Sequence, residues 1–290
     1  MSRTGINLDE VLPTNNVMFQ MIFGDERHPR ILIHFLNSVI KPETPIKKVS
    51  IRRESATNQD HVLDKCPRLD IIADTDNEII NVEIQVTPQD HIVDRLLYYW
   101  SKLFAGQLIV GQKYHELKRT VSITVLSFDF FDEDDQYWRR AFLTNDHDGK
   151  RLTDKLEVHV IEIDKLRELK KDSPLTFWIE FFKNPYSEQV KSLCEFVPEI
   201  REAKEVFERA KSDPFAQEQM RIHEKAVMDY ASGIATARDE GKAEGLAEGE
   251  LKKARETARN LLSMGLSVEQ IAKATGLSFE SIADLQNCKS

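Results

Sequence analysis

The chain has 290 residues, of which 41% are hydrophobic and 31% are charged, and its formal net charge is −9. This composition is typical of a soluble globular protein and allows one large domain with a smaller appendage. The three cysteines are scattered and lack a metal-binding spacing, so they indicate a reducing compartment without disulfides. Since we find neither a signal peptide nor an apolar run of ~18 residues, we expect a cytoplasmic protein.

The acidic balance does not by itself indicate a nucleic-acid binder, but a nuclease needs only a local basic surface. Four short basic clusters are candidates for such a surface, with ordinary solvated charge as the alternative interpretation. They are Lys47-Lys48, Arg52-Arg53, Lys118-Arg119 and Arg139-Arg140.

The first fifty residues predict two helices followed by a strand. Thr14 or Asn15 can cap a helix that ends at Gly24. Apolar residues at helical spacing predict a second helix over 28–40, and a strand is expected over 47–54.

Residues 68–85 predict two strands joined by a turn at 74–77. Asp70 and Glu83 lie inside these apolar strands, where a carboxylate is costly unless something compensates its charge. Facing strands can bring the two carboxylates within ~4–6 Å, where they repel unless a proton or a divalent cation lies between them. Gln85 follows Glu83 by two positions and shares its face. The alternative is ordinary polarity at the edge of a hairpin.

A long helical segment over 89–116, broken near Gly111, precedes a predicted strand over 120–128. A right-handed strand–helix–strand crossover would lay this helix across the sheet that carries the carboxylates. Arg95 and Lys102, on one helical face, are then expected near the site. The alternative for Lys102 is an ordinary amphipathic side chain.

The acidic loop 129–135 lacks the spacing of an EF-hand, so we interpret it as solvated rather than cation-binding. The remaining pattern predicts two strands and then a helical region that continues toward the C-terminus. The strands are expected over 137–143 and 156–163, and the helices over 173–182, 186–196, 198–210 and from 214 onward.

In the helical tail, Gly241, Gly245 and Gly249 recur every four residues. Each glycine costs a helix about 1 kcal/mol relative to alanine, so this helix needs a neighbour. One interpretation is a self-association face, because the glycines form a stripe that permits close approach. The other is a mobile spacer between folded parts.

Residues 254–286 predict three short helical pieces, and Ser267 with Gln270 forms a capping box for the second. The last two pieces resemble a helix-turn-helix. The final helix, however, offers Glu280 and Asp284, whereas helices that read bases usually offer basic or amide side chains. A packing or dimerisation module is therefore preferred over sequence-specific DNA reading.

The Asp70…Glu83-x-Gln85 pattern resembles the D-x(n)-(D/E)-x-K core of the PD-(D/E)XK nucleases, with glutamine in place of lysine. Together with the segments around it, the pattern resembles the PD-(D/E)XK nuclease family of transposases, also called Rpn recombination-promoting nucleases. The resemblance implies an α/β fold: a restriction-endonuclease-like core of mixed β-sheet flanked by helices, with an α-helical C-terminal tail. The other segments that carry it are 13–26, 34–40 and 95–128.

This resemblance implies an Mg²⁺-dependent DNA endonuclease associated with recombination or mobile DNA. The implied metal ligands are Asp70, Glu83 and the main-chain carbonyl of Ile84. Gln85 can orient a water molecule, and Lys102 is the candidate for the cation that the motif lysine would supply. Asn16 stands where the family usually carries an acid, and it is an auxiliary candidate together with Arg95 and Tyr99.

We expect a nuclease-like domain over 1–183, a helical extension over 184–253 and a small helix-turn-helix-like module over 254–290. The expected partner is DNA, double-stranded, and the expected assembly is a homo-oligomer formed through the tail. The main alternative, favoured by Asn16 and Gln85, is a degenerate nuclease fold that acts as a DNA- or protein-binding oligomeric module. A third possibility is an oligomeric scaffold whose tail carries the function.

Overall fold

The computed structural model describes residues 7–53, 71–88, 91–170 and 173–287. The chain consists of two compact units, Met1–Lys225 and Ala226–Ser290, and helix α7 (Pro214–Ser263) contributes to both. This division differs from the expected boundaries after residues 183 and 253. The reason is that the helices that follow residue 184 bury their apolar faces in the same core as the sheet.

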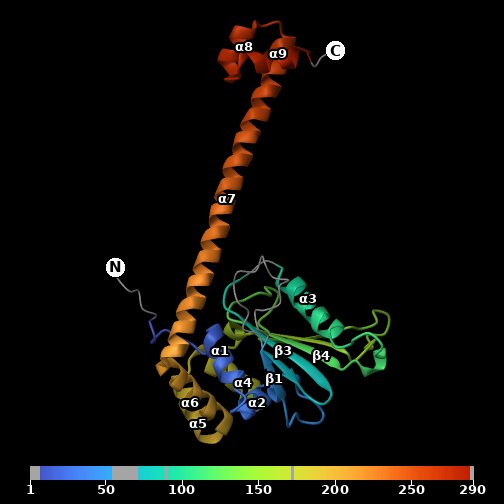
Figure 1. Ribbon diagram of the computed structural model, residues 1–290, viewed down its shortest axis with the longest axis vertical. Helices are drawn as coiled ribbons and strands as arrows, with labels where there is room; N and C mark the ends of the chain where they lie inside the picture. Colours follow the sequence, from blue (N-terminus) through green and yellow to red (C-terminus); the bar gives the residue numbers. More distant parts are fainter. Residues whose placement is uncertain (1–6, 54–70, 89–90, 171–172, 288–290) are drawn as a thin grey trace. The chain divides into compact units, whose positions relative to one another are not determined.

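A six-stranded mixed sheet with the order β1-β2-β3-β4-β6-β5 forms the centre of the first unit (Figure 1). β1, β2 and β3 are antiparallel neighbours, β3, β4 and β6 are parallel, and β5 pairs antiparallel with β6. The predicted mixed sheet is therefore confirmed. Its strands are β1 (Ser50–Arg53), β2 (Ile71–Asp74), β3 (Glu78–Gln85), β4 (Arg119–Leu126), β5 (Trp138–Phe142) and β6 (Leu156–Glu162).

Helices lie on both sides of this sheet. α1, α2 and α4 gather on one side and α3 on the other (Figure 1). The helices of the first unit are α1 (Asn16–Phe23), α2 (Pro29–Ile40), α3 (Ile92–Ala105), α4 (Pro174–Lys183), α5 (Glu188–Phe196), α6 (Pro198–Ser212) and the first turns of α7.

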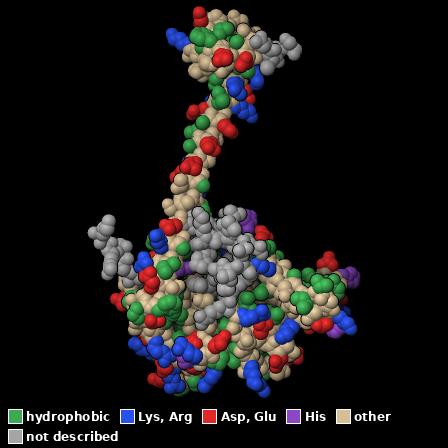
Figure 2. All heavy atoms as spheres, in the orientation of Figure 1, with side chains coloured by type: hydrophobic (Ala, Val, Ile, Leu, Met, Phe, Trp, Pro, Cys, Tyr) green, Lys and Arg blue, Asp and Glu red, His purple; other side chains and the backbone are tan. Residues whose placement is uncertain are grey.

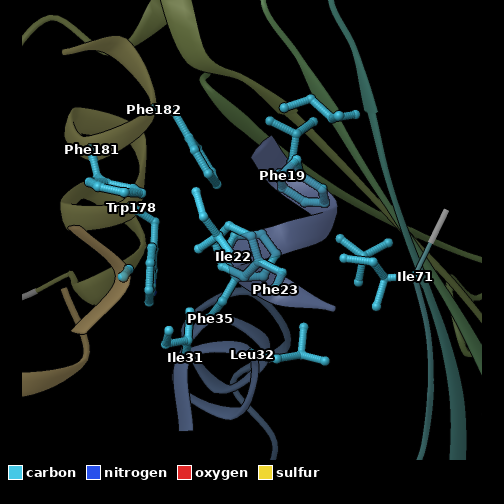
Figure 3. Close-up of a cluster of buried hydrophobic side chains, with 14 of the residues drawn as sticks. Phe19, Ile22, Phe23, Ile31, Leu32, Phe35, Ile71, Trp178, Phe181 and Phe182 are labelled. Carbon is cyan, nitrogen blue, oxygen red and sulfur yellow. The ribbon is translucent and has the colours of Figure 1, made fainter. Parts of the chain in front are cut away.

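An aromatic cluster fills the space between α1, α2 and α4 (Figure 3). The Phe23 ring centroid lies 5.2 Å from those of both Phe35 and Trp178. Burying a side chain of this size contributes about 2–3 kcal/mol. The predicted start of α1 is confirmed, because the Asn15 side chain accepts hydrogen bonds from the backbone N–H groups of Val17 and Met18.

Alternation along β4 separates the two faces of the sheet. Val121, Ile123 and Val125 belong to the core shared with α1, α2 and α4. Ser122 and Thr124 alternate with them and therefore lie on the opposite face, which we call the α3 face.

The predicted helix over 89–116 is wrong in its last part. α3 ends at Ala105, and the N–H of Gly106 donates to the carbonyl of Lys102 at 2.9 Å. A turn and a 3₁₀ helix at Tyr114–Glu116 follow. The Gln107 side chain explains the change of direction, because its Oε1 accepts from the N–H of Lys118 at 2.8 Å and ties the chain to the start of β4. As predicted, α3 joins two parallel strands, β3 and β4.

The second unit contains the rest of α7, α8 (Val268–Thr275) and α9 (Phe279–Asn287). The expectation of three short helical pieces over 254–286 is wrong for the first piece, which is the last part of the continuous helix α7. The capping box of Ser267 and Gln270 is confirmed. In the part of the chain that the structure describes, no helix has the length and apolarity needed to cross a membrane.

Candidate active site

Glu83 lies on the α3 face of β3 and is only 5% exposed. Its partner in the parallel register is Thr124 of β4, whose hydroxyl donates to Oε1 of Glu83 at 2.9 Å. A carboxylate in this position loses hydration, and a hydrogen bond to the charged form compensates part of that loss. The bond also restricts the orientation of the carboxylate.

The predicted hairpin is confirmed from Ile71 onward. Ile71 pairs with Val82, the residue before Glu83, and the N–H of Thr75 closes the turn on the carbonyl of Glu78 at 2.9 Å. Asp70 lies outside the described residues, so its expected approach to Glu83 stays a prediction.

Polar side chains continue along the α3 face beside Glu83. Asn81 is 3% exposed and its register partner Ser122 is 1% exposed. The Oγ of Ser122 has no hydrogen-bond partner among the residues that the structure describes. Our prediction missed this row. The alternation of hydroxyl and β-branched apolar residues from Thr120 to Val125 was the signal that could have revealed it.

Helix α3 covers the same face of the sheet, as expected. Ile92 and Leu96 are buried against Leu126, Val158 and Val160. Of these, Val160 pairs with Thr124 and therefore shares the face of Glu83. Near the other end of the helix, the indole N–H of Trp100 donates to the carbonyl of Thr120 at 2.8 Å.

Lys102 lies in the last turn of α3 and is half-buried, as are Arg95 and Tyr99. The spacing of four and seven positions places these three side chains on one flank of the helix. A cation in the last turn also stabilises the helix through its dipole, which is a structural role for Lys102. A catalytic role of Lys102 toward Glu83 stays a prediction.

Gln85 is half-buried at the end of β3, on the face of Glu83. Its carbonyl accepts a hydrogen bond from the N–H of Ser127 at 3.1 Å, which extends the ladder beyond β4. The Ile84 side chain between them points into the core. These residues therefore hold Glu83 and Gln85 on one rigid strand.

Asn16 begins α1, on the core side of the sheet. Its Nδ2 lies 3.0 Å from Nε2 of His223 in the first turns of α7. Burial lowers the pKa of His223, which favours the neutral ring that accepts this hydrogen bond. Asn16 Oδ1 and His223 Nδ1 are buried and have no hydrogen-bond partner among the described residues. The structure thus assigns Asn16 a contact between α1 and α7, and its auxiliary role stays a prediction.

A second buried carboxylate, Glu157 of β6, lies on the core face and is contacted by two arginines and a histidine. It contacts Nη2 of Arg119, Nε of Arg140 at 2.9 Å and Nε2 of His159 at 2.7 Å. Burial raises the pKa of Glu157, but the hydrogen bonds from His159, Arg140 and Arg119 outweigh it and lower the pKa to about 2. Since the indole N–H of Trp138 donates to Nδ1 of His159, the proton of the neutral ring lies on Nε2. The hydrogen bonds and ion pairs within this cluster compensate the buried charge of Glu157, so we assign the cluster a role in the stability of the fold.

Within the described ranges, no three His, Cys, Asp or Glu side chains gather to hold a metal ion. In the acidic loop 129–135, Asp134 forms an ion pair with Arg139 at 2.6 Å. A metal centre formed by Glu83 together with Asp70, which lies outside the described residues, stays a prediction.

Two family comparisons agree with this arrangement. Residues 13–237 match the family described as PD-(D/E)XK nuclease family transposase, and residues 245–287 match the Rpn/YhgA-like nuclease family, C-terminal HTH domain. Searches of curated proteins and of solved structures gave no match. The family supports a nuclease role for the sheet domain and a DNA-binding role for the terminal helices. Because the first match covers more than half of the chain, the protein belongs to the PD-(D/E)XK nuclease family of transposases and carries the C-terminal domain of the Rpn/YhgA-like nucleases.

Proposed function

We propose that this protein is an Mg²⁺-dependent endonuclease that hydrolyses phosphodiester bonds in double-stranded DNA, in association with recombination or mobile DNA. The observation that carries the proposal is Glu83, a carboxylate that is 5% exposed and hydrogen-bonded by Thr124. It lies in the hairpin whose sequence resembles the acidic motif of the PD-(D/E)XK nucleases, within the residues that match the family.

We propose Asp70, Glu83 and the carbonyl of Ile84 as the metal ligands. These are hard oxygen donors, which Mg²⁺ prefers, so the residue types fit the ion. When bound, Mg²⁺ acts as a Lewis acid and lowers the pKa of a water molecule. Thr124 contributes by holding the Glu83 carboxylate in one orientation.

The charges of the neighbouring side chains indicate their proposed roles. Gln85 lies on the same face as Glu83 and can orient a water molecule, but it carries no charge. Lys102 is the proposed source of the positive charge that stabilises the transition state, and Arg95 and Tyr99 line the same flank of α3. We expect Lys102→Ala to lower cleavage more than DNA binding. Equal losses would make Lys102 a phosphate contact only.

Plasmid cleavage with Mg²⁺ tests the proposed function. Wild type should nick or cut supercoiled DNA in Mg²⁺ but not in EDTA, and Asp70→Ala should lower the rate more than about 100-fold. Asp76→Ala is the matched control, because Asp76 is an exposed acid in the turn of the same hairpin. A rate in Asp70→Ala equal to that of the control would overturn the proposal.

A catalytically degenerate module is the second candidate. Gln85 in place of the motif lysine favours it, as does the amide Asn16, which is engaged with His223. In that case wild type would bind DNA without cutting it under any divalent cation. For either function we propose a homo-oligomer formed through the exposed glycine-rich turns of α7.

A further inference from the structure

A protein that holds duplex DNA needs exposed cations that its own acids do not neutralise. In three of the four basic clusters singled out in the first unit, an arginine is engaged by an acidic side chain: Arg52 by Asp74, Arg119 by Glu157 and Arg139 by Asp134. The fourth cluster, Lys47-Lys48, is exposed and forms no ion pair with another described residue, but it contains only two cations.

In the second unit, positive charge is concentrated in the last turns of α7. Four of the eight residues from 252 to 259 are basic and one, Glu256, is acidic. All four basic side chains are exposed, and none of the ion pairs between described residues involves them. Figure 2 shows Lys and Arg side chains on these turns, next to the terminal helices. We call this set the α7 basic face: Lys252, Lys253, Arg255 and Arg259.

Packing in the second unit leaves this face open. Lys252, Arg255 and Arg259 are three and seven positions apart, so they lie on one side of the helix. Ala258 is fully buried and contacts α8 and α9 through a cluster that includes Ile271. The terminal helices therefore pack beside the α7 basic face and do not cover it.

The helix that would read bases in a helix-turn-helix carries the opposite charge. α9 contains Glu280 and Asp284 and, between residues 279 and 287, no Lys or Arg. Both acids are repelled by phosphates. Among the helices of this unit, the positive charge available to DNA is thus concentrated on α7.

We propose that the α7 basic face binds the phosphate backbone of duplex DNA, and that α9 does not enter the major groove to read bases. Binding by this unit is therefore independent of sequence and strongly dependent on salt. The proposal rests on the proposed function only for its choice of DNA as the partner.

The test measures binding of a fluorescent random-sequence duplex by anisotropy. The full chain carries Glu83→Gln and the buffer contains EDTA, so that cleavage does not enter. Lys252→Gln, Lys253→Gln, Arg255→Gln and Arg259→Gln together should weaken binding at least about 10-fold. The slope of log K against log salt should become shallower by up to about 3.6, since each phosphate contact contributes about 0.9.

Two matched variants control for loss of charge and of fold. Removing the other described cations of this unit (Arg238, Lys242 and Lys273) should change affinity less than about 3-fold. Exchanging Lys for Arg and Arg for Lys at the four positions should keep binding, because a phosphate accepts either cation. The proposal would be overturned if the four-glutamine variant bound DNA within about 2-fold of the parent. It would also be overturned if the first control lost as much affinity as the four-glutamine variant, or if the exchange variant lost affinity. If wild type does not cleave plasmid but the four-glutamine variant still loses binding, the proposed function fails and this proposal stands.

Discussion

The two units of this protein differ in the size of their hydrophobic cores and in the ionisable residues that they contain. The first unit has an extensive core that includes buried Trp178, buried Phe rings and the carboxylates Glu83 and Glu157, and it contains all eight histidines of the chain. The second unit has a small core of four buried residues, Ala258, Ile271, Ile282 and Leu285, and no histidine. Most of the other described side chains of its long helix are exposed.

This difference shows that the two proposed activities, hydrolysis of DNA and binding of its phosphates, have different structural requirements. A hydrolytic centre needs a carboxylate held in a fixed orientation, and a packed sheet can supply that. A phosphate-binding surface needs exposed charge on a regular spacing, which a single helix supplies with little core. The predictions below separate the two units.

The largest effect is expected from Trp178→Ala. The Trp178 ring is fully buried against Phe23 and Phe35, and its loss should destabilise the first unit by about 3–5 kcal/mol. Phe279→Ala is the control, because Phe279 is 60% exposed in the second unit and should cost less than about 0.5 kcal/mol. Urea unfolding followed by near-UV circular dichroism measures the difference. Equal costs would contradict the contrast between the cores.

Acid should weaken the first unit selectively. Burial lowers the pKa of His34, His159 and His223 below 6.5, so under mild acid the unfolded chain takes up protons that the folded chain does not. Stability therefore falls as pH decreases through about 6.5. Glu157, with its pKa lowered from 4.5 to about 2, adds a second loss between these values, of the order of 3 kcal/mol when complete.

The second unit lacks histidine, so its helicity should stay constant between about pH 8 and pH 5. Unfolding curves over this range, with amide exchange to resolve the units, check the difference. A first unit whose stability rises on acidification would show that these histidines are not buried in the neutral form.

Thr124→Val should act on the site without unfolding it. Valine keeps the volume of threonine but removes the hydroxyl that orients Glu83, and we expect about 10–100-fold weaker metal binding. Thr124→Ser should recover most of it. Ser122→Ala is the control, since no described residue bonds its hydroxyl. Mn²⁺ binding followed by electron paramagnetic resonance, with cleavage rates alongside, measures the effect; an equal loss in Ser122→Ala would exclude a specific role for Thr124.

The smallest effect is expected from Gly245→Ala. Apart from its chain neighbours and the adjacent backbone of its own helix, a methyl group at this position meets no described atom within 4 Å, so the helix should gain up to about 1 kcal/mol of local stability. Slower amide exchange in the neighbouring turns would show the gain. If a second copy of the chain approaches the glycine stripe, Gly245→Leu should keep or raise the helicity yet reduce the mass measured by light scattering. A wild type that is monomeric at all accessible concentrations would exclude self-association.

The sequence predicted those parts of the fold that depend on local pattern. The alternation around Glu83, the cap at Asn15 and the capping box at Ser267 were sufficient to place their elements. It could not predict that α3 ends at Ala105, because the side chain of Gln107 fixes the following turn through a contact with Lys118. The same limit hid the partner of Glu83, since Thr124 lies 41 residues away and meets it only through the parallel register.

Single-turnover cleavage by Glu83→Gln tests the central claim most directly. The substitution keeps the shape of the side chain and removes its charge, so the fold and duplex binding in EDTA should match wild type. We predict that Mg²⁺-dependent cleavage falls more than about 100-fold while DNA affinity changes less than about 3-fold. Cleavage at the wild-type rate, or a parallel loss of cleavage and of DNA binding, would contradict a metal-dependent nuclease centre at Glu83.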